Sequence, residues 1–339
     1  MLPQPLFLLD DRSQVGNARR AAIELAQASG FDDEQSGKVG LAVTEIATNV
    51  LKHAGHGRVL LRSLDSDGIA GVEIIALDKG PGIADVSASL RDGHSTTGTM
   101  GGGLGALSRM SAGFELFTQP GRGTAVRLDL WAKPLPERSR PIEYGGLCIP
   151  KHGETVSGDG WAVEEWRDEL SVLLADGLGH GMSAHDAARA AREAFHAHPQ
   201  YAPGAMLEAC HGALARTRGA AIATARVIAS AERGNFAGVG NIVSRIEAST
   251  ANRHLVSHNG TVGHTMRKVQ EFAFPWPRGA LLVMHSDGLG THWDLAAYPG
   301  LSSRHPALIA AVLYRDYDRG RDDVSVVVIR NRGGSPESP

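Results

Sequence analysis

Four aspartates in the second half of the chain stand beside strand-like apolar runs, in positions where they could bind metal ions. With the glycines that follow two of them, these residues are Asp159-Gly160, Asp176-Gly177, Asp287 and Asp322. The first two pairs lie in VSGDGWAVEEWRDELSVLLADGLGHGMSA, around a segment that reads as two strands. An Asp-Gly pair alone is typical of a turn, so turn residues and metal ligands are both interpretations.

Carboxylate and carbonyl oxygens are hard ligands that suit Mg²⁺ or Mn²⁺. A glycine after the aspartate lets an ion approach the backbone closely. Two ions bridged by one carboxylate can activate a water molecule and hold a phosphate group for in-line attack, without a serine or cysteine nucleophile. The four aspartates in this order therefore suggest metal-assisted hydrolysis.

The first half carries three features of another kind. Glu45 and Asn49 are four residues apart on a predicted helix, so they share one side of it. The segment LDKGPGI (77–83) ends a strand with an Asp/Gly turn. The segment GHSTTGTMGGGLG (93–105) opens a helix, and backbone N–H groups at such a loop favour an anion. The loop is neither a Walker A loop, because it has no Gly-Lys-Ser/Thr end, nor a dinucleotide fingerprint following a first strand.

The elements that would position these residues follow from hydrophobic periodicity. Helices are expected over 17–29, 33–53 and about 104–112, and the segments GRVLLRSL, GVEIIALD and GTAVRLDLW read as strands. This pattern predicts an α+β domain with an antiparallel sheet and helices on one face.

The second half has more strands, with two Ala-rich helices over about 182–198 and 204–217. We expect two sheets packed face to face and covered by helices, an α-β-β-α sandwich. The Pro-rich segment AKPLPERSRPIE separates the halves. The predicted organisation is a first domain over 1–132, a linker over 133–141, a second domain over 142–331 and a tail over 332–339.

Composition narrows the classes of function. The net charge is −3 with no basic block, which argues against nucleic acid or a membrane surface as the main partner. The two cysteines, Cys148 and Cys210, form no disulfide framework. No signal peptide and no run of 18 apolar residues is present, so the expected location is the cytoplasm.

The three features of the first half resemble, in this order, the GHKL-type (HATPase) ATP-binding fold of gyrase, histidine kinases and MutL. Over about residues 10–131 the closer resemblance is to the RsbT- and RsbW-type serine kinases that regulate sigma factors. It implies ATP with Mg²⁺, with Asn49 holding the Mg²⁺ and Glu45 accepting the proton of the attacking serine hydroxyl. The other implied contacts are Asp78 with the adenine amino group, Gly80 and Gly82 beside the base, Gly101, Gly103 and Gly105 along the phosphates, and Thr124 near the adenine.

The four aspartates resemble those of the type-2C metal-dependent serine/threonine phosphatases, in the SpoIIE and RsbX branch, over about residues 142–331. The resemblance implies two Mn²⁺ or Mg²⁺ ions, with Asp176 bridging both. Asp159, beside Gly160, and the Gly177 carbonyl would complete the coordination of the first ion. Asp287 and Asp322 would bind the second. Asp323 has a supporting place, and His180 is either a loop residue or a proton donor.

The resemblances together imply a bifunctional signalling protein, a serine kinase joined to a phosphoserine/phosphothreonine phosphatase. The implied partners are STAS-domain anti-sigma-factor antagonists or stressosome-like proteins, and self-association is allowed. Because GGGLGALSRM departs from the expected Gly-Leu-Gly-Leu run, a first domain that binds ATP or sequesters a partner without phosphate transfer stays an alternative. In a second alternative, ATP bound to the first domain controls the phosphatase allosterically. In a third, the first half is vestigial and only the phosphatase is active.

Overall fold

The chain is described by a computed structural model. The structure describes residues 4–90, 103–136, 140–249, 251–267 and 269–333. They form two compact units, of which the first contains residues 4–136 together with Ala296–Arg304 and the second contains the remainder. Within these described ranges no helix is long and apolar enough to cross a membrane.

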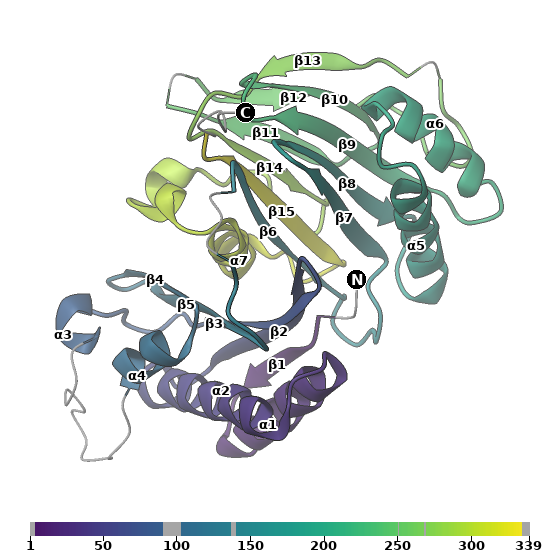
Figure 1. Ribbon diagram of the computed structural model, residues 1–339. Coiled ribbons are helices and arrows are strands. Elements are labelled where there is room, and N and C mark those ends of the chain that lie inside the picture. Colours follow the sequence, from purple (N-terminus) through teal and green to yellow (C-terminus); the bar gives the residue numbers. More distant parts are fainter. Residues whose placement is uncertain (1–3, 91–102, 137–139, 250, 268, 334–339) are drawn as a thin grey trace. The chain divides into compact units, whose positions relative to one another are not determined.

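The first unit is built on one antiparallel sheet with the strand order β1-β2-β3-β5-β4. Its strands are β1 (Leu6–Leu9), β2 (Gly57–Ser66), β3 (Ile69–Leu77), β4 (Gly113–Gln119) and β5 (Gly123–Trp131). Its helices are α1 (Arg12–Ala28), α2 (Asp33–Ala54), α3 (Val86–Leu90) and α4 (Gly103–Met110). Helices α1 and α2 lie side by side on one face of the sheet (Figure 1). The expected α+β architecture is confirmed.

Helix α2 forms where its sequence predicts. Asp32 caps its N-terminus, because the Asp32 carboxylate accepts from the Gln35 N–H and the Gln35 side chain accepts from the Asp32 N–H. Its apolar residues recur every three or four positions, and Val39, Val43 and Ile46 are buried against the sheet. The polar residues between them are left on the flanks of that buried face.

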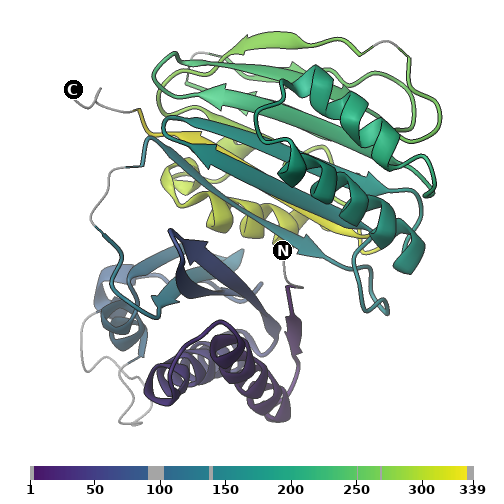
Figure 2. The ribbon, with the colours of Figure 1, turned by 45° about the vertical axis from the view of Figure 1, so that its right-hand side comes forward.

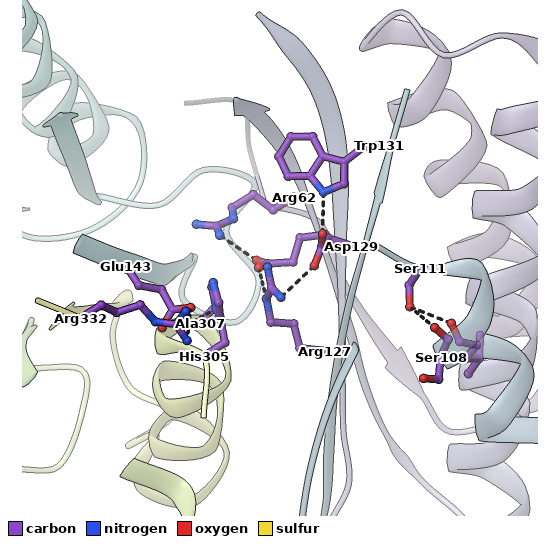
Figure 3. A network of polar contacts seen from close by, with 12 residues as sticks. Arg62, Ser108, Ser111, Arg127, Asp129, Trp131, Glu143, His305, Ala307 and Arg332 are labelled. Carbon is purple, nitrogen blue, oxygen red and sulfur yellow. Dashed lines mark hydrogen bonds and ion pairs between the residues drawn. The ribbon is translucent and has the colours of Figure 1, made fainter. Parts of the chain in front are cut away.

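Charged side chains tie three strands of this sheet together (Figure 3). Glu73 on β3 is fully buried and pairs with Arg62 on β2 at 2.8 Å and with Arg127 on β5 at 2.7 Å. Arg127 also contacts Asp129, which accepts from the Trp131 indole N–H. A buried charge is tolerated only when it is paired. The network therefore fixes the register of β3 and β5, the strands that lead to Asp78 and Thr124.

The second unit is a sandwich of two antiparallel sheets, with the strand orders β13-β10-β9-β8-β7 and β12-β11-β14-β15-β6. Its strands are β6 (Ile142–Ile149), β7 (Asp159–Trp166), β8 (Glu169–Gly177), β9 (Ala220–Ile228), β10 (Arg233–Val239), β11 (Val243–Glu247), β12 (Arg253–Leu255), β13 (Phe272–Pro275), β14 (Leu281–His285) and β15 (Val324–Asn331). Its α-helices are α5 (Met182–Ala197), α6 (Pro203–Ala213) and α7 (Pro306–Tyr317). Short 3₁₀ turns cover Leu295–Ala297, where the chain passes from the second unit to the first, and Leu301–Ser303, which belongs to the first unit.

The layers of the sandwich are held by two apolar cores. One core lies between the sheets and includes Val172 and Phe236 on one side and Leu282 and Val327 on the other. The second core joins α5 and α6 to the outer face of the β7–β10 sheet (Figure 2). Helix α7 packs against β6 and β15. The predicted α-β-β-α sandwich is confirmed, but its helix α7 was not predicted from the sequence.

Candidate active sites

Helix α2 carries Glu45 and Asn49 one turn apart, as predicted. Both side chains are half-buried, whereas Ile46 and Val50 beside them are buried in the core. The helix therefore holds the two polar groups at the edge of its packed face. At its end Ala54 lies against Gly80, because a Cβ on Gly80 would come 2.6 Å from the Ala54 Cβ.

Asp78 directly follows β3 and organises the turn after it. Its Oδ1 accepts from the Gly80 N–H at 2.8 Å and from the Thr124 N–H at 3.1 Å. The Thr124 hydroxyl lies 3.1 Å from that of Thr118, which also accepts from the Ile83 N–H. Asp78, Gly80 and Thr124, separated by up to 46 positions in the sequence, are thus brought together in one turn.

Two glycines allow the backbone to pack closely around this turn. Gly82 has φ +78°, and a Cβ there would lie 2.5 Å from the Gln119 carbonyl oxygen. Gly123 has φ +87°, and a Cβ there would lie 2.1 Å from the Asp78 carbonyl oxygen. Both positions therefore require glycine. Gly123 is a residue that the sequence analysis missed, although its neighbour Thr124 was identified.

The glycines of the predicted phosphate loop are only partly described. Gly101 and the segment 93–102 lie outside the described residues. Gly103 begins α4 with φ +44°, and Gly105 is buried within the same helix. Helix α4 contacts α2, the helix that carries Glu45 and Asn49. The placement of Gly103 at a helix start agrees with the predicted loop-to-helix junction.

The second site centres on the β7–β8 hairpin. Asp159 is the first residue of β7 and stands directly opposite Asp176 on β8. The hairpin turn is at the other end of the pair, around Arg167, which has φ +55°. Like charges directly opposite each other on neighbouring strands are unfavourable unless a cation lies between them. The two aspartates are therefore not turn residues, and their pairing calls for a positive charge.

The electrostatics of the pair agree with this. Asp159 is 4% exposed, and its Oδ2 has no hydrogen-bond partner among the described residues. Burial, and then Asp176, raises the pKa of Asp159 well above its usual range, while the Ser286 hydroxyl beside it opposes the shift. The pKa of Asp176 is raised to about 7, mainly by burial and further by the negative charges of Asp287 and Asp322. Divalent cations would relieve both effects.

Two further carboxylates reach this site from the other sheet. Asp287 follows β14, and its Oδ2 accepts from the Asn241 side-chain N–H at 2.7 Å. Asp322 precedes β15, and its Oδ1 accepts from the Asp323 N–H. Burial and Asp322 raise the pKa of Asp287, so these two carboxylates are close enough to interact. The strand ends thus gather all four predicted aspartates.

Asp323 has a more buried position than its supporting place in the sequence analysis suggested. It is 3% exposed, its Oδ1 accepts from the Lys151 N–H at 2.8 Å, and its Oδ2 has no partner among the described side chains. Burial raises its pKa. Asp323 therefore anchors the segment between β6 and β7 that leads into Asp159.

The residues present fit a hard divalent cation. Within the described residues, no group of three or more His, Cys, Asp or Glu side chains converges on one point. Mg²⁺ binds through one or two carboxylates and keeps several waters, so such convergence is not required. The unpartnered buried oxygen of Asp159, facing Asp176, is the observation that indicates a cation.

Glycines make room at this site as well. Gly177 is buried, and a Cβ there would lie 2.3 Å from the Ala184 carbonyl oxygen of α5. A Cβ on Gly160 would lie 2.9 Å from the Arg192 Nε. The loop after Gly177 carries His180, whose Nδ1 lies 2.6 Å from Glu154 Oε1. Glu154 was not identified from the sequence.

Asn241, which bonds Asp287, is another residue that was not identified from the sequence. We expect Asn241→Ala to weaken the binding of one Mn²⁺ ion roughly 10- to 100-fold, because an outer-shell hydrogen bond orients a ligating carboxylate. Calorimetric Mn²⁺ titration measures this. The control is Asn235→Ala, which removes a side chain that bonds Glu271 instead. Equal Mn²⁺ affinity in both variants would contradict the role.

Comparison with known proteins assigns each half of the chain to a known family or domain type. Residues 8–130 match the family described as histidine kinase-like ATPase domain, and residues 167–332 match that of stage II sporulation protein E (SpoIIE). The serine/threonine-protein kinase RsbT of Bacillus subtilis (strain 168) is 33% identical over 116 residues, which are 34% of this chain and 87% of RsbT. The phosphoserine phosphatase RsbX of the same organism is 21% identical over 154 residues, 45% of this chain and 77% of RsbX.

Solved structures extend this comparison. RsbX in complex with magnesium shares the fold at a TM-score of 0.50 and 19% identity, over 57% of this chain and 97% of that one. A chain from the structure described as "The bacterial stressosome: a modular system that has been adapted to control secondary messenger signaling" is 26% identical at a TM-score of 0.53, over 56% of this chain and 99% of that one.

The folds and sites define a class of protein in which a histidine kinase-like ATPase domain is joined to a type-2C phosphatase domain. The chain belongs to the RsbT-type serine kinase family through its first half, fused to a SpoIIE- and RsbX-like phosphatase domain in its second.

Proposed function

We propose that this chain removes phosphate from phosphoserine or phosphothreonine of a protein partner at its second site, and transfers phosphate from ATP to serine at its first. The phosphatase half rests above all on one observation, the buried Asp159 facing Asp176 with an unpartnered oxygen. Such a pair is stable when cations neutralise it.

The proposed residue roles follow the positions of the carboxylates. Asp176 would bridge two Mn²⁺ or Mg²⁺ ions, Asp159 and the Gly177 carbonyl would hold the first, and Asp287 and Asp322 would hold the second. The ions, when bound, supply an activated water and neutralise the phosphate charge. Asn241 orients Asp287, and Asp323 holds the Lys151 segment that leads into β7.

The kinase half rests on the turn at Asp78 and on the polar side of α2. Asp78 and Thr124 would bind the adenine, and Gly80 and Gly82 would let the base approach. Gly101, Gly103 and Gly105 would line the phosphates. Asn49 would bind Mg²⁺ and Glu45 would accept the serine proton. A positioned carboxylate base and a metal are what phosphoryl transfer requires.

The partner we propose is a STAS-domain anti-sigma-factor antagonist or a stressosome-like protein. Support comes from the relatives RsbT and RsbX and from the similarity to a chain of the bacterial stressosome. Phosphorylation adds close to two negative charges to a serine, which can switch the binding of such a protein.

A direct test of the phosphatase half uses a STAS-domain protein phosphorylated on serine. We expect the full chain to remove the phosphate with Mn²⁺ or Mg²⁺ present, and to lose all activity on chelation and recover it when the ion returns. Intact-mass spectrometry follows the phosphate. Activity that survives complete chelation would contradict the metal-dependent mechanism.

A further inference from the structure

The segment Ala296–Arg304, here called the strap, comes from the second half of the chain but belongs to the first unit. Its Tyr298 side chain is buried against the β4–β5 hairpin. The Tyr298 ring lies 6.3 Å from the Phe117 ring of β4, measured between centroids, and the Arg122 Cζ lies 5.6 Å from the centre of the Tyr298 ring. Contact with a second ring and with a cation makes Tyr298 the anchor of the strap.

The same hairpin forms one wall of the turn that we propose to hold the adenine. A Cβ on Gly82 would lie 2.5 Å from the Gln119 carbonyl oxygen, so the two backbones are in contact. One residue earlier on β4, the Thr118 hydroxyl accepts from the Ile83 N–H at 2.9 Å. The Gln119 side-chain N–H, in contrast, donates to the Ala297 carbonyl of the strap at 3.3 Å. Gln119 therefore contacts the nucleotide turn through its backbone and the strap through its side chain.

The stretch 286–295, here called the Asp287 loop, leads from β14 to the strap and is anchored in the second unit. The buried Trp293 indole N–H donates to His285 Nε2 at 3.0 Å. The Trp293 carbonyl accepts from Arg245 Nη1 at 3.1 Å, and the Arg245 Cζ lies 4.2 Å from the centre of the Trp293 ring. Two residues separate Trp293 from the strap. A restraint on the strap therefore acts close to an anchored point of the Asp287 loop.

We propose that the strap, through Tyr298, couples nucleotide binding in the first unit to the Asp287 loop of the second. The inference rests on the proposed function of the two sites. A nucleotide in the turn packs against the β4–β5 hairpin and restricts its motion, and the hairpin then restricts Tyr298. Because only a short stretch of chain joins Tyr298 to Trp293, the Asp287 loop loses freedom as well. Ordering of this kind couples two sites without a large change of shape.

Amide hydrogen exchange of the full chain, followed by mass spectrometry, measures this coupling with and without ADP. Free Mg²⁺ is held at the same concentration in both samples, so that only the nucleotide differs. In the wild type, ADP should slow exchange at the nucleotide turn, over 78–83 and 118–124. It should also slow exchange in the Asp287 loop, roughly 5-fold or more, because local opening there is suppressed. With saturating ADP, Tyr298→Ala should show the first effect and lose the second.

Three further variants separate coupling from a general loss of structure. Tyr298→Phe keeps the ring and should behave as the wild type. Arg122→Ala removes the cation from the Tyr298 ring but leaves the ring in place, and should weaken the protection of the Asp287 loop. The matched control is Tyr201→Ala, which removes a tyrosine ring of the second unit that stacks on His198 at 4.5 Å. ADP should protect the Asp287 loop of this control as it does in the wild type.

The outcomes distinguish this inference from the proposed function. Protection of the nucleotide turn with no change in the Asp287 loop of the wild type overturns the coupling and leaves the nucleotide site standing. Equal protection of the Asp287 loop in the wild type and in Tyr298→Ala overturns the role of the strap. If ADP protects neither region, the nucleotide site and the coupling both fail. If ADP protects both regions but the chain transfers no phosphate to a partner, the kinase activity fails and the coupling stands.

Discussion

Asp176→Asn is expected to abolish phosphatase turnover, by at least about 1,000-fold, and at the same time to stabilise the metal-free protein at pH 8. Turnover is lost because the carboxylate that we propose as a ligand of both ions becomes a neutral amide, which is a far poorer metal ligand. Stability rises because Asp176 faces Asp159 across the hairpin, so removing one charge removes a like-charge contact.

The pH dependence of this effect follows from the raised pKa of Asp176, about 7. In the unfolded chain Asp176 loses its proton near pH 4, whereas in the folded protein it keeps the proton up to about pH 7. Between about pH 4 and pH 7 the folded state therefore binds more protons than the unfolded state, and raising the pH lowers the free energy of unfolding. The metal-free wild type should therefore lose stability as pH rises through about 7. Asp176→Asn should lose less over the same window.

Scanning calorimetry with chelator at pH 6 and pH 8 measures this difference in stability. Adding Mn²⁺ should raise the stability of the wild type more at pH 8 than at pH 6. The control is Asp168→Asn, at the turn end of the same hairpin, where the carboxylate contacts Ser230. If Asp176→Asn is no more stable than Asp168→Asn at pH 8, or if it keeps its phosphatase activity, the assignment of Asp176 is wrong.

Glu45→Gln is expected to lower phosphate transfer to the partner by at least about 100-fold while ATP affinity changes little. An amide keeps the shape of the side chain but cannot accept the serine proton. Asn49→Ala should instead weaken the binding of ATP in the presence of Mg²⁺. The two changes lie one helical turn apart, so their contrasting effects separate the base from the metal ligand.

Glu34→Gln is the matched control for Glu45→Gln. Glu34 is an exposed carboxylate at the start of the same helix and pairs with Lys38. Phosphate transfer is followed by intact-mass spectrometry and ATP binding by calorimetry. Transfer by Glu45→Gln at the rate of Glu34→Gln would remove Glu45 from the mechanism.

Local patterns predicted the elements that carry the sites. Helix α2 was expected over 33–53 and spans Asp33–Ala54, because its apolar periodicity and its capping residues agree. The helix expected over 204–217 ends at Ala213 instead, because the Thr217 hydroxyl bonds the Leu214 carbonyl and starts a turn. Helix α7 was missed because Pro306–Arg315 is buried on every side and shows no polar face.

The site could be predicted only as far as residue type and order reveal it. The four aspartates were identified, but their meeting depends on sheet register, which places Asp159 opposite Asp176 and brings Asp287 from the other sheet. Asn241 and Glu154 act through contacts distant in the sequence, with Asp287 and His180, and no local pattern marks them.

The central claim is that one chain both adds and removes phosphate on the same class of partner. The most direct measurement incubates a STAS-domain partner with ATP, Mg²⁺ and the wild type, Glu45→Gln or Asp176→Asn, and follows the partner's phosphate by mass spectrometry. We predict that phosphate appears, persists longest with Asp176→Asn and is absent with Glu45→Gln. If no variant adds phosphate while the wild type strips it from a pre-phosphorylated partner, the first half is an ATP-binding module and the claim of two activities is contradicted.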